Sequence, residues 1–176
     1  MNNKRFAAAL LIAALFAAMS FSNLFSQDMQ PPKPVENKTF DAMVGDWSGE
    51  MQSMGMTYKT DFSVRWALNH QFIIIDLKGE NKDNANMKYS GHGIYGFDDK
   101  GSIKSWWFDD WGFYGTSTGS GTVSGSKFDV SSANDFYSET RSFDVNGNDA
   151  KMNAKGTYVM NGQKVPFEET GTYHRK

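Results

Sequence analysis

The stretch from Met56 to Leu68 alternates between two chemical characters, and this alternation constrains the fold more than any other feature. One set of residues is mainly apolar or aromatic: Met56, Tyr58, Thr60, Phe62, Val64, Trp66 and Leu68. The intervening set is mainly polar: Thr57, Lys59, Asp61, Ser63, Arg65 and Ala67. Because a β-strand turns successive side chains to opposite faces, each set shares one face. Weaker versions of the pattern recur to the C-terminus, so the sequence predicts an all-β chain around an aromatic interior.

The N-terminus has the pattern of a secretion signal. Lys4 and Arg5 precede an almost unbroken apolar run over residues 6–19, and Ala18 and Ser20 have a spacing that a signal peptidase accepts. A second cleavage point is expected near residues 26 and 27. We therefore expect residues 1–27 to be a signal peptide and the mature protein to be periplasmic or secreted. The apolar run is shorter than the ~20 residues of a membrane span, although an uncleaved anchor is the alternative.

Composition narrows the function classes. The chain has no Cys, which excludes disulfides, thiol catalysis and thiolate metal sites. Without Lys4 and Arg5, 16 basic residues face 20 acidic ones, and no basic stripe is visible. We therefore expect no nucleic-acid partner. About 150 residues remain after cleavage, enough for one domain with its own core.

The mature chain is expected to begin with a lead-in and to continue as one barrel. Residues 28–38 contain three prolines and should be extended. Thr39 is expected to cap a short helical turn whose Phe40, Met43 and Val44 face the fold. Residues 39–176 then form the barrel domain. Strands are predicted near 46–53, 56–68, 71–80, 86–97, 102–109, 112–118, 121–125, 127–133, 136–145, 150–160 and 163–174.

Tight turns between these strands predict an antiparallel meander. Asn69-His70, Asn146-Gly147 and Asn161-Gly162 are turn signals, as is the segment 98–101. With about ten strands, closing the sheet removes exposed edges, so a single antiparallel up-and-down β-barrel is the first expectation and a sandwich the second. An outer-membrane barrel is disfavoured because Lys and Asp fall in mid-strand and Gly, Ser and Thr interrupt the apolar faces.

Several motifs, taken in order, resemble a known family. They are the segments 43–50 (MVGDWSGE), 64–73 (VRWALNHQFI), 89–98 (YSGHGIYGFD), 107–110 (WFDD) and 173–176 (YHRK). In this order they are similar to an uncharacterised family of bacterial lipocalin-like proteins, a domain of unknown function. The resemblance covers about residues 40–176 and implies a lipocalin-like or calycin-type barrel with no established activity. One departure is Asn69-His70, where the family usually places glycines.

The Gly-Asp-Trp opening is also similar to nitrobindin, a haem-binding barrel. A haem protein of that kind needs a proximal His on a late strand. This chain contains only His70, His92 and His174, and none stands in a matching late-strand motif. We therefore predict no cofactor.

Two aromatic features are candidates for structure or for ligand contact. Trp47, at the start of the first strand, is expected to plug one end of the barrel, with Arg175 or Arg65 stacked on its indole. The run from Trp106 to Tyr114 is the densest aromatic segment. Trp107 should share a face with Ile103 and Ser105, while its neighbours point the other way. The run then serves as core and rim packing, or as a ring-lined mouth for a flat ligand.

Candidate catalytic groups are few. Asp109 and Asp110 diverge as strand neighbours, which favours turn formation or solvation over an acid–base pair. His92 is out of phase with Tyr89 and Tyr95 and is expected to be solvated or hydrogen-bonded. No Ser–His–Asp set and no metal-spaced His pair is visible, so we predict no catalytic and no metal residues.

Glu169 is a charged residue in an unusual position, because it shares one face of the last strand with apolar residues. A carboxylate inside an aromatic barrel must find a partner or change its pKa. It could orient the polar head of a ligand, or bond Tyr158 or a buried water.

The sequence therefore predicts an exported barrel that sequesters or carries a small apolar or aromatic ligand. One alternative is an enzyme that uses Glu169 or His92 for proton transfer in the same cavity. The other is a self-filled barrel that acts through its outer surface as an envelope interaction module. The oligomeric state is open. The predicted ligand-binding residues are Tyr58, Phe62, Trp66, Tyr89, Tyr95, Trp107, Tyr158 and Glu169.

Overall fold

The fold is described from a computed structural model, which covers residues 31–176. The predicted signal peptide and the start of the lead-in lie outside the described residues. Residues 31–37 have no helix or strand, and no helix in the described part of the chain is long and apolar enough to cross a membrane. The elements are α2 (Lys38–Met43), β1 (Gly45–Ser53), β2 (Met56–Ala67), β3 (Phe72–Asn81), β4 (Lys88–Phe97), β5 (Ile103–Asp109), the 3₁₀ helix η1 (Gly112–Gly115), β6 (Ser117–Ser124), β7 (Lys127–Ala133), β8 (Tyr137–Asn146), β9 (Asp149–Met160) and β10 (Gln163–Arg175).

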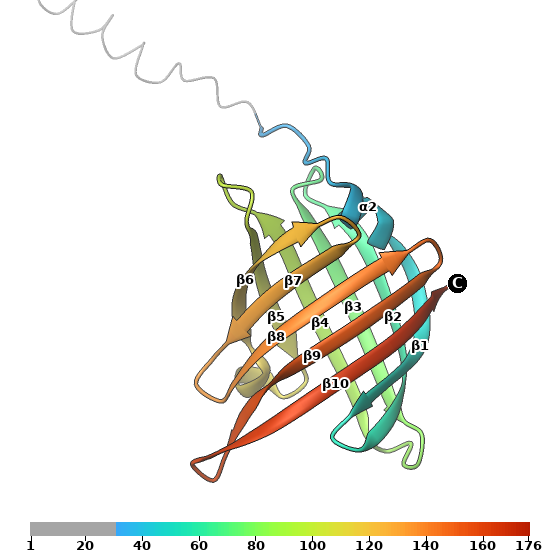
Figure 1. The fold of residues 1–176 in the computed structure, drawn as a ribbon, viewed down its shortest axis with the longest axis vertical. Coiled ribbons are helices and arrows are strands. Elements are labelled where there is room, and N and C mark those ends of the chain that lie inside the picture. The colour runs from blue at the N-terminus through green and yellow to red at the C-terminus, as the bar shows by residue number, and fades with distance from the viewer. Residues whose placement is uncertain (1–30) are drawn as a thin grey trace, which may run out of the picture. The chain divides into compact units, whose positions relative to one another are not determined.

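The ten strands form one closed, antiparallel barrel (Figure 1). Each strand pairs with its neighbours in sequence, and β1 pairs with β10 to close the sheet. The closing register runs from Trp47 opposite Arg175 to Ser53 opposite Glu169. The predicted up-and-down barrel is confirmed, and the sandwich alternative is wrong. Closure leaves no sheet edge open to pairing with another chain.

The predicted strands at 112–118 and 121–125 are wrong. Residues 112–115 form η1, and a single strand, β6, covers both the end of the first range and most of the second. The chain bends after β5 because the backbone N–H of Trp111 donates to Asp109 Oδ1 at 3.0 Å and Gly112 adopts a φ of 65°. A left-handed glycine at this point ends the extended conformation that the aromatic run suggested.

The N-cap of the short helix α2 lies two residues earlier than the sequence predicted. The side chain of Asn37, rather than that of Thr39, accepts from the backbone N–H groups of Thr39 and Phe40 at 3.1 and 3.0 Å. Asn is among the strongest N-cap residues, so it takes this role when it precedes the helix. The Thr39 hydroxyl instead donates to the carbonyl of Gly125 at 2.6 Å and ties α2 to the β6–β7 turn.

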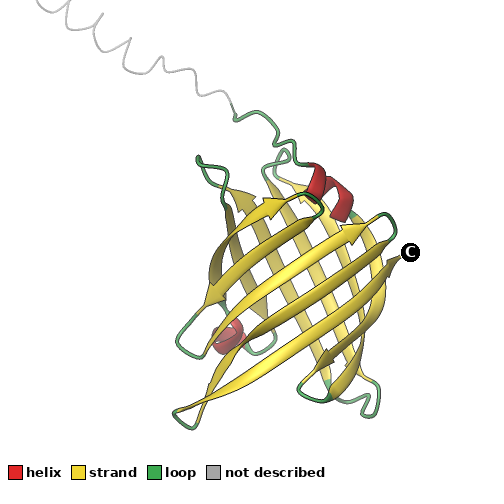
Figure 2. Ribbon diagram, in the orientation of Figure 1, coloured by secondary structure: helices red, strands yellow, loops and turns green. Residues whose placement is uncertain are grey.

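Helix α2 covers one end of the barrel, and Trp47 completes the seal (Figure 2). Phe40 and Met43 are buried, and the Trp47 indole donates to the carbonyl of Met43 at 2.8 Å. Arg175 stacks on the indole with its guanidinium carbon 4.4 Å from the ring centroid, and donates to the carbonyls of Val44 and Ala42. The predicted plug is confirmed, and Arg175 rather than Arg65 stacks on it.

Packed rings fill the half of the barrel next to α2, which we call the apolar half. Phe62 lies at its centre, stacked on Trp47 and edge-on to Phe143 and Tyr173, with ring centroids 4.9 to 6.0 Å apart. Such pairs lie in the attractive range for aromatic rings and leave little space between them. The other buried members are aliphatic or aromatic: Phe40, Met43, Val64, Ile73, Ile75, Ile103, Phe128, Val130 and Val145.

The predicted turn at Asn69-His70 connects β2 to β3 in a left-handed conformation. Leu68, Asn69 and His70 all have φ between 50° and 57°, and the N–H of Gln71 closes the turn on the carbonyl of Ala67. Left-handed backbone costs about 1–2 kcal/mol for each L-residue. The His70 ring is stacked 4.9 Å from Trp66, whose indole donates to Asp41 of α2, so tertiary contacts hold the turn in place.

Candidate functional site

The inward faces of the strands change character away from α2, in a region we call the polar half. This region contains three kinds of side chain: charged, hydroxyl-bearing and aromatic. The charged members are Asp109, Glu139, Arg141 and Glu169, the hydroxyl-bearing members are Ser53, Thr60, Ser105, Ser117 and Ser132, and the aromatic members are Tyr58, Tyr89, Tyr95, Trp107, Tyr137 and Tyr158.

Glu169 is held by a buried ion-pair cluster. Its Oε2 accepts from Arg141 Nη2 at 3.0 Å, and its Oε1 accepts from the Ser53 hydroxyl at 2.8 Å. The same guanidinium donates to both oxygens of Glu139, from Nε at 3.2 Å and from Nη2 at 2.9 Å. The partner that Glu169 required is therefore an arginine on β8, not Tyr158. Two carboxylates share this one guanidinium.

A third carboxylate faces the same region from β5. Asp109 Oδ2 accepts from the Tyr89 hydroxyl at 3.0 Å and lies 3.3 Å from the Trp107 indole nitrogen, which also lies 3.1 Å from the Tyr89 oxygen. Trp107 rests against β4, where a Cβ on Gly91 would stand 2.2 Å from the indole ring. Only glycine leaves room for the ring there, so Gly91 provides the surface on which Trp107 packs.

Three hydroxyls of the interior make no hydrogen bond within residues 31–176. Tyr95 and Tyr173 are 7% and 2% exposed, and their hydroxyls have no partner in this part of the chain. The Thr60 hydroxyl also has none, and of the three it is the one that is fully enclosed. The hydroxyls of Tyr95 and Tyr173 therefore reach space that water or a ligand can fill, whereas Thr60 is closely packed.

Two further observations indicate a hollow in this half of the barrel. Arg141 contacts Glu139, Glu169 and Met152 inside the barrel, yet 29% of its side chain remains accessible. Gly79 is buried on β3, and a Cβ there would make ordinary contacts of 3.8 Å with Tyr58 and Thr60, so the interior has room for at least one more methyl group at this position. Side chains therefore do not fill the polar half as they fill the apolar half.

Electrostatics keep the tyrosines neutral and the guanidinium charged. Burial raises the pKa of Tyr95 and of Tyr173 to about 12. Burial also raises the pKa of Tyr89, with the charge of Asp109 as the second cause, and the pKa values of Tyr137 and Tyr158 are raised by burial as well. For Arg141 burial acts to lower the pKa, but Glu139 and Glu169 outweigh it and hold the pKa well above its usual value. Neutral phenols and a fixed cation therefore border the hollow.

The structure divides the predicted ligand-binding residues between the two halves. Tyr58, Tyr89, Trp107, Tyr158 and Glu169 face the polar half, whereas Tyr95 stands at the boundary, opposite Ile73 and 5.8 Å from the Phe128 ring, with its own ring leaning over Gly93. Phe62 is central to the apolar packing, and Trp66 lies beside α2, so neither borders the hollow. The division arises because residues four to eight positions apart on one strand face share an orientation but not a depth along the barrel. Contact of any of these residues with a ligand stays a prediction.

His92 lies on the outer face of β4. Its Nδ1 is 2.6 Å from Asp76 Oδ1, and the same carboxylate accepts from Arg65, whose hydrogen bond is the main reason that the pKa of Asp76 is lowered. The expectation of a hydrogen-bonded His is confirmed. Because His92 points away from the interior, it does not share a cavity with Glu169. In the described part of the chain no three His, Cys, Asp or Glu side chains are placed to hold a metal ion together.

Sequence reasoning missed the two β8 residues that complete the cluster. Tyr137, Glu139 and Arg141 alternate on the same face as the partly buried Phe143 and the buried Val145. That alternation was available in the sequence, but it places charges on a face that binary patterning expects to be apolar. Asp109 was assigned to a turn. It does bond the turn at Trp111, but it also accepts from two interior side chains.

An exposed aromatic rim lies at the end of the barrel opposite α2, around η1 (Figure 2). Trp111, Phe113 and Tyr114 are exposed, and the last two pack on Phe136 with ring centroids 6.2 and 4.5 Å apart. Exposed aromatic groups of this size are uncommon on soluble proteins and often mark contact sites. Of the two readings of the aromatic run, this position supports a ring-lined mouth beside the polar half.

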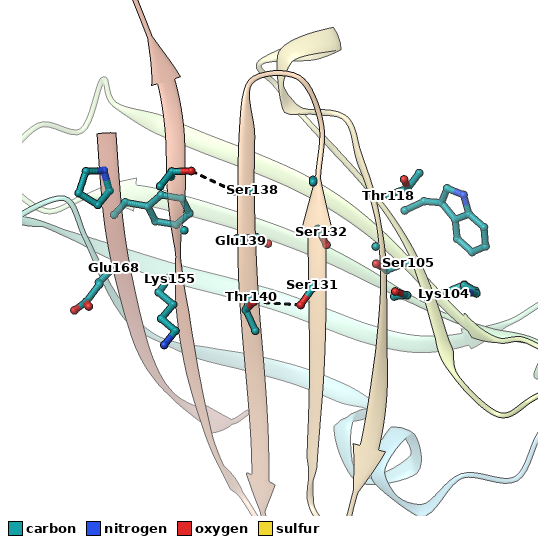
Figure 3. A pocket seen from close by; sticks show the side chains of 18 residues that line it. Lys104, Ser105, Thr118, Ser131, Ser132, Ser138, Glu139, Thr140, Lys155 and Glu168 are labelled. Atoms are coloured by element: carbon teal, nitrogen blue, oxygen red, sulfur yellow. Dashed lines mark hydrogen bonds between the residues drawn. The ribbon is translucent and has the colours of Figure 1, made fainter. Parts of the chain in front are cut away.

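A shallow trough of about 1040 Å³ crosses the outer face of β5 to β10 (Figure 3). Its lining includes six outward-facing Ser and Thr residues, together with Lys104, Lys155 and Glu168. Four of these hydroxyls pair with one another: Ser131 with Thr140 at 3.1 Å and Ser138 with Thr157 at 3.2 Å. Because the trough faces solvent and these four groups are satisfied, the interior cluster is the stronger candidate site.

Comparisons with known proteins find solved structures of similar fold. No protein-family model matches the chain, and no curated protein matches it by sequence. Among solved structures, Rv2717c from M. tuberculosis is similar with a TM-score of 0.62 and 12% identity, over 81% of this chain and 99% of that one. The S-type phycobiliprotein lyase CPES from Guillardia theta has a TM-score of 0.61 and 12% identity, over 78% and 90%. EF1p2_mFAP2b bound to DFHBI has a TM-score of 0.50 and 11% identity, over 79% and 98%.

These likenesses show the fold alone, because all three identities are far below the level that carries function. The chain has a lipocalin-like, calycin-type barrel. The family to which it belongs is not fixed by them.

Proposed function

We propose that this chain is an exported protein that binds a small ligand in the polar half of its barrel and sequesters or carries it. The observation that carries the proposal is the space inside the barrel that is reached by the unpartnered hydroxyls of Tyr95 and Tyr173 and by the partly accessible side chain of Arg141. A ligand with an apolar or aromatic body would pack on the tyrosine and tryptophan rings, while its polar group would bond the hydroxyls or a carboxylate.

The proposal assigns a role to each predicted ligand-binding residue that faces the hollow. Tyr58, Tyr89, Tyr95, Trp107 and Tyr158 would supply ring contacts, and Glu169 would orient the ligand. A solved structure of similar fold, EF1p2_mFAP2b, is bound to the small molecule DFHBI, which is consistent with a ligand inside a barrel of this type. Export rests on the signal pattern of residues 1–27, and membership of the uncharacterised lipocalin-like family rests on the ordered motifs of residues 40–176.

The test uses the neutral aromatic dye N-phenyl-1-naphthylamine, whose fluorescence rises in an apolar site. We expect the mature protein to bind it with saturable enhancement. Gly79→Leu should abolish the enhancement, because the new side chain would occupy the hollow next to Tyr58 and Thr60. Glu80→Leu places the same side chain on the outer face one residue away and should leave binding unchanged.

Two outcomes would contradict the proposal. One is the absence of saturable dye binding by the mature protein. The other is equal binding by Gly79→Leu and the unaltered protein, which would place the dye on the outside, for example at the aromatic rim. Native mass spectrometry of protein purified from its own host is an independent measurement, and we expect it to show a retained small molecule.

A further inference from the structure

The polar half carries more negative than positive charge. Among its inward-facing residues in the described chain, Arg141 is the one cation, and Asp109, Glu139 and Glu169 are carboxylates. Arg175, the other inward-facing cation, lies at the α2 end on Trp47. With every group ionised, the region bordering the hollow has a net charge of −2. An isolated excess charge in a protein interior is costly unless a counter-charge or water compensates it.

Protein atoms already engage most of the N–H donors of Arg141. Its Nε and Nη2 donate to Glu139, Nη2 also donates to Glu169, and Nη1 lies 3.4 Å from the sulfur of Met152. One of the five guanidinium hydrogens, on Nη1, is left for a ligand. A ligand carboxylate or phosphate at that hydrogen would lie beside two protein carboxylates that repel it, so Arg141 is a poor anion site.

The carboxylates, in contrast, keep accepting capacity. Each oxygen of Glu169 accepts one hydrogen bond, from Ser53 and from Arg141, although a carboxylate can accept about four in all. The hydroxyls of Tyr95 and Tyr173, which make no hydrogen bond in the described part of the chain, are further groups that a ligand could bond. The Tyr173 hydroxyl lies against Gly171 of β10, two residues from Glu169.

The walls of the hollow have the chemistry that receives organic cations. Tyr158 stacks on Phe167 with ring centroids 4.4 Å apart and lies 6.0 Å from the Tyr137 ring, so their rings form a continuous aromatic surface. Ring faces attract cations through their quadrupole, and the attraction strengthens where water is excluded. Aromatic faces and surplus carboxylates thus favour the same sign of charge.

We infer that the ligand of the polar half is an organic cation, an amine or quaternary ammonium on an apolar or aromatic body, held by Glu169 and the surrounding tyrosine rings. This inference rests on the proposed function, which it deepens by giving the ligand a charge. The ammonium group supplies the positive charge that the cluster lacks, and the body packs where the dye is expected to pack.

The test compares three probes with the same body and different charge: 2-naphthylmethylammonium, 2-naphthylmethanol and 2-naphthoate. Displacement of N-phenyl-1-naphthylamine gives their affinities. We expect the ammonium to bind about tenfold more tightly than the alcohol, and the carboxylate to bind most weakly. This series uses the unaltered protein and does not depend on any variant being folded.

A variant pair then locates the charge. Glu169→Gln removes one interior carboxylate and should reduce the preference for the ammonium over the alcohol about tenfold. Glu168→Gln removes a carboxylate from the outer face of the same strand and should leave the preference intact.

The outcomes separate the two proposals. If the dye binds but the ammonium has no advantage, or the carboxylate binds best, the cation inference is wrong and the ligand-binding function stands. If the preference is equal in Glu169→Gln and Glu168→Gln, the charge responsible is not in the hollow, and the inference is also wrong. If neither dye nor probes bind, both proposals fail together.

Discussion

The half of the barrel next to α2 and the half farthest from it are built on the same ten strands, yet they bury different chemistry. In the apolar half, Phe62 sits among closely packed rings whose centroids are 4.9 to 6.0 Å away. In the polar half, Arg141 holds two carboxylates, and the hydroxyls of Tyr95 and Tyr173 have no partner within the described residues.

This difference shows that the two halves have separate roles along the barrel axis: the apolar half stabilises the fold, and the polar half has the capacity to bind. Close packing and the Trp47 seal stabilise one end, so the other end can keep unsatisfied groups and space without unfolding the domain. Proteins generally tolerate such local penalties at sites where a ligand can later relieve them.

The largest expected effect compares two positions on the same face of β2. Phe62→Ala should lower the free energy of unfolding by about 4 kcal/mol, because it opens a cavity among packed rings. Tyr58→Ala, four residues away in the polar half, should cost about 1 kcal/mol, because water can replace a ring that borders a hollow. Urea unfolding of both variants measures the difference. Equal losses would mean that both halves are equally packed.

The next effect concerns the ion-pair cluster. Arg141→Met should destabilise the protein by about 3 kcal/mol, because it leaves Glu139 and Glu169 buried without a cation. Adding Glu139→Gln and Glu169→Gln to the same chain should recover most of that loss, and thermal unfolding of the two variants would show it. If Arg141→Met alone were as stable as the unaltered protein, Glu139 and Glu169 would be solvated rather than enclosed.

Alkaline pH should act on the buried phenols. The pKa of Tyr95 is raised to about 12 from the model-compound value of 10.0, so the folded state retains its proton where the unfolded state loses it. The contribution of this raised pKa to the free energy of unfolding is complete below pH 10 and is lost as the pH rises toward 12. Near pH 11 the loss is about 1 kcal/mol. In Tyr95→Phe, the free energy of unfolding measured in urea should fall less at alkaline pH, because this phenol is no longer present to ionise. A pH dependence unchanged by Tyr95→Phe would show that another group is responsible.

The smallest effect tests the closed end. Leu68 is exposed and has a φ of 50°, so Leu68→Gly should relieve left-handed strain and raise stability by about 0.5 kcal/mol after the greater chain entropy of glycine is counted. Dye binding in the polar half should not change. A loss of stability would mean that the Leu68 side chain makes contacts worth more than the strain.

Much of the fold followed from local chemistry. Alternation on β2 and the Asn-Gly turns predicted strands, turns and closure, and Trp47 with Arg175 predicted the seal. The segment 112–118 was assigned to a strand because aromatic residues favour strands in general, whereas a left-handed Gly112 and a bond to Asp109 decided the bend. The candidate site was only half predictable: alternation placed Glu169 inside, but its partner Arg141 lies 28 positions away, and only the strand register brings them together.

The most direct test of the account is a crystal structure at atomic resolution of the mature protein purified from its own host. The account predicts density for ordered water or a bound small molecule within hydrogen-bond distance of Tyr95, Tyr173 or Glu169. It predicts none between Phe62, Phe143 and the Trp47 seal. Side chains packed tightly through both halves, with the Tyr95 and Tyr173 hydroxyls bonded to protein atoms, would contradict it.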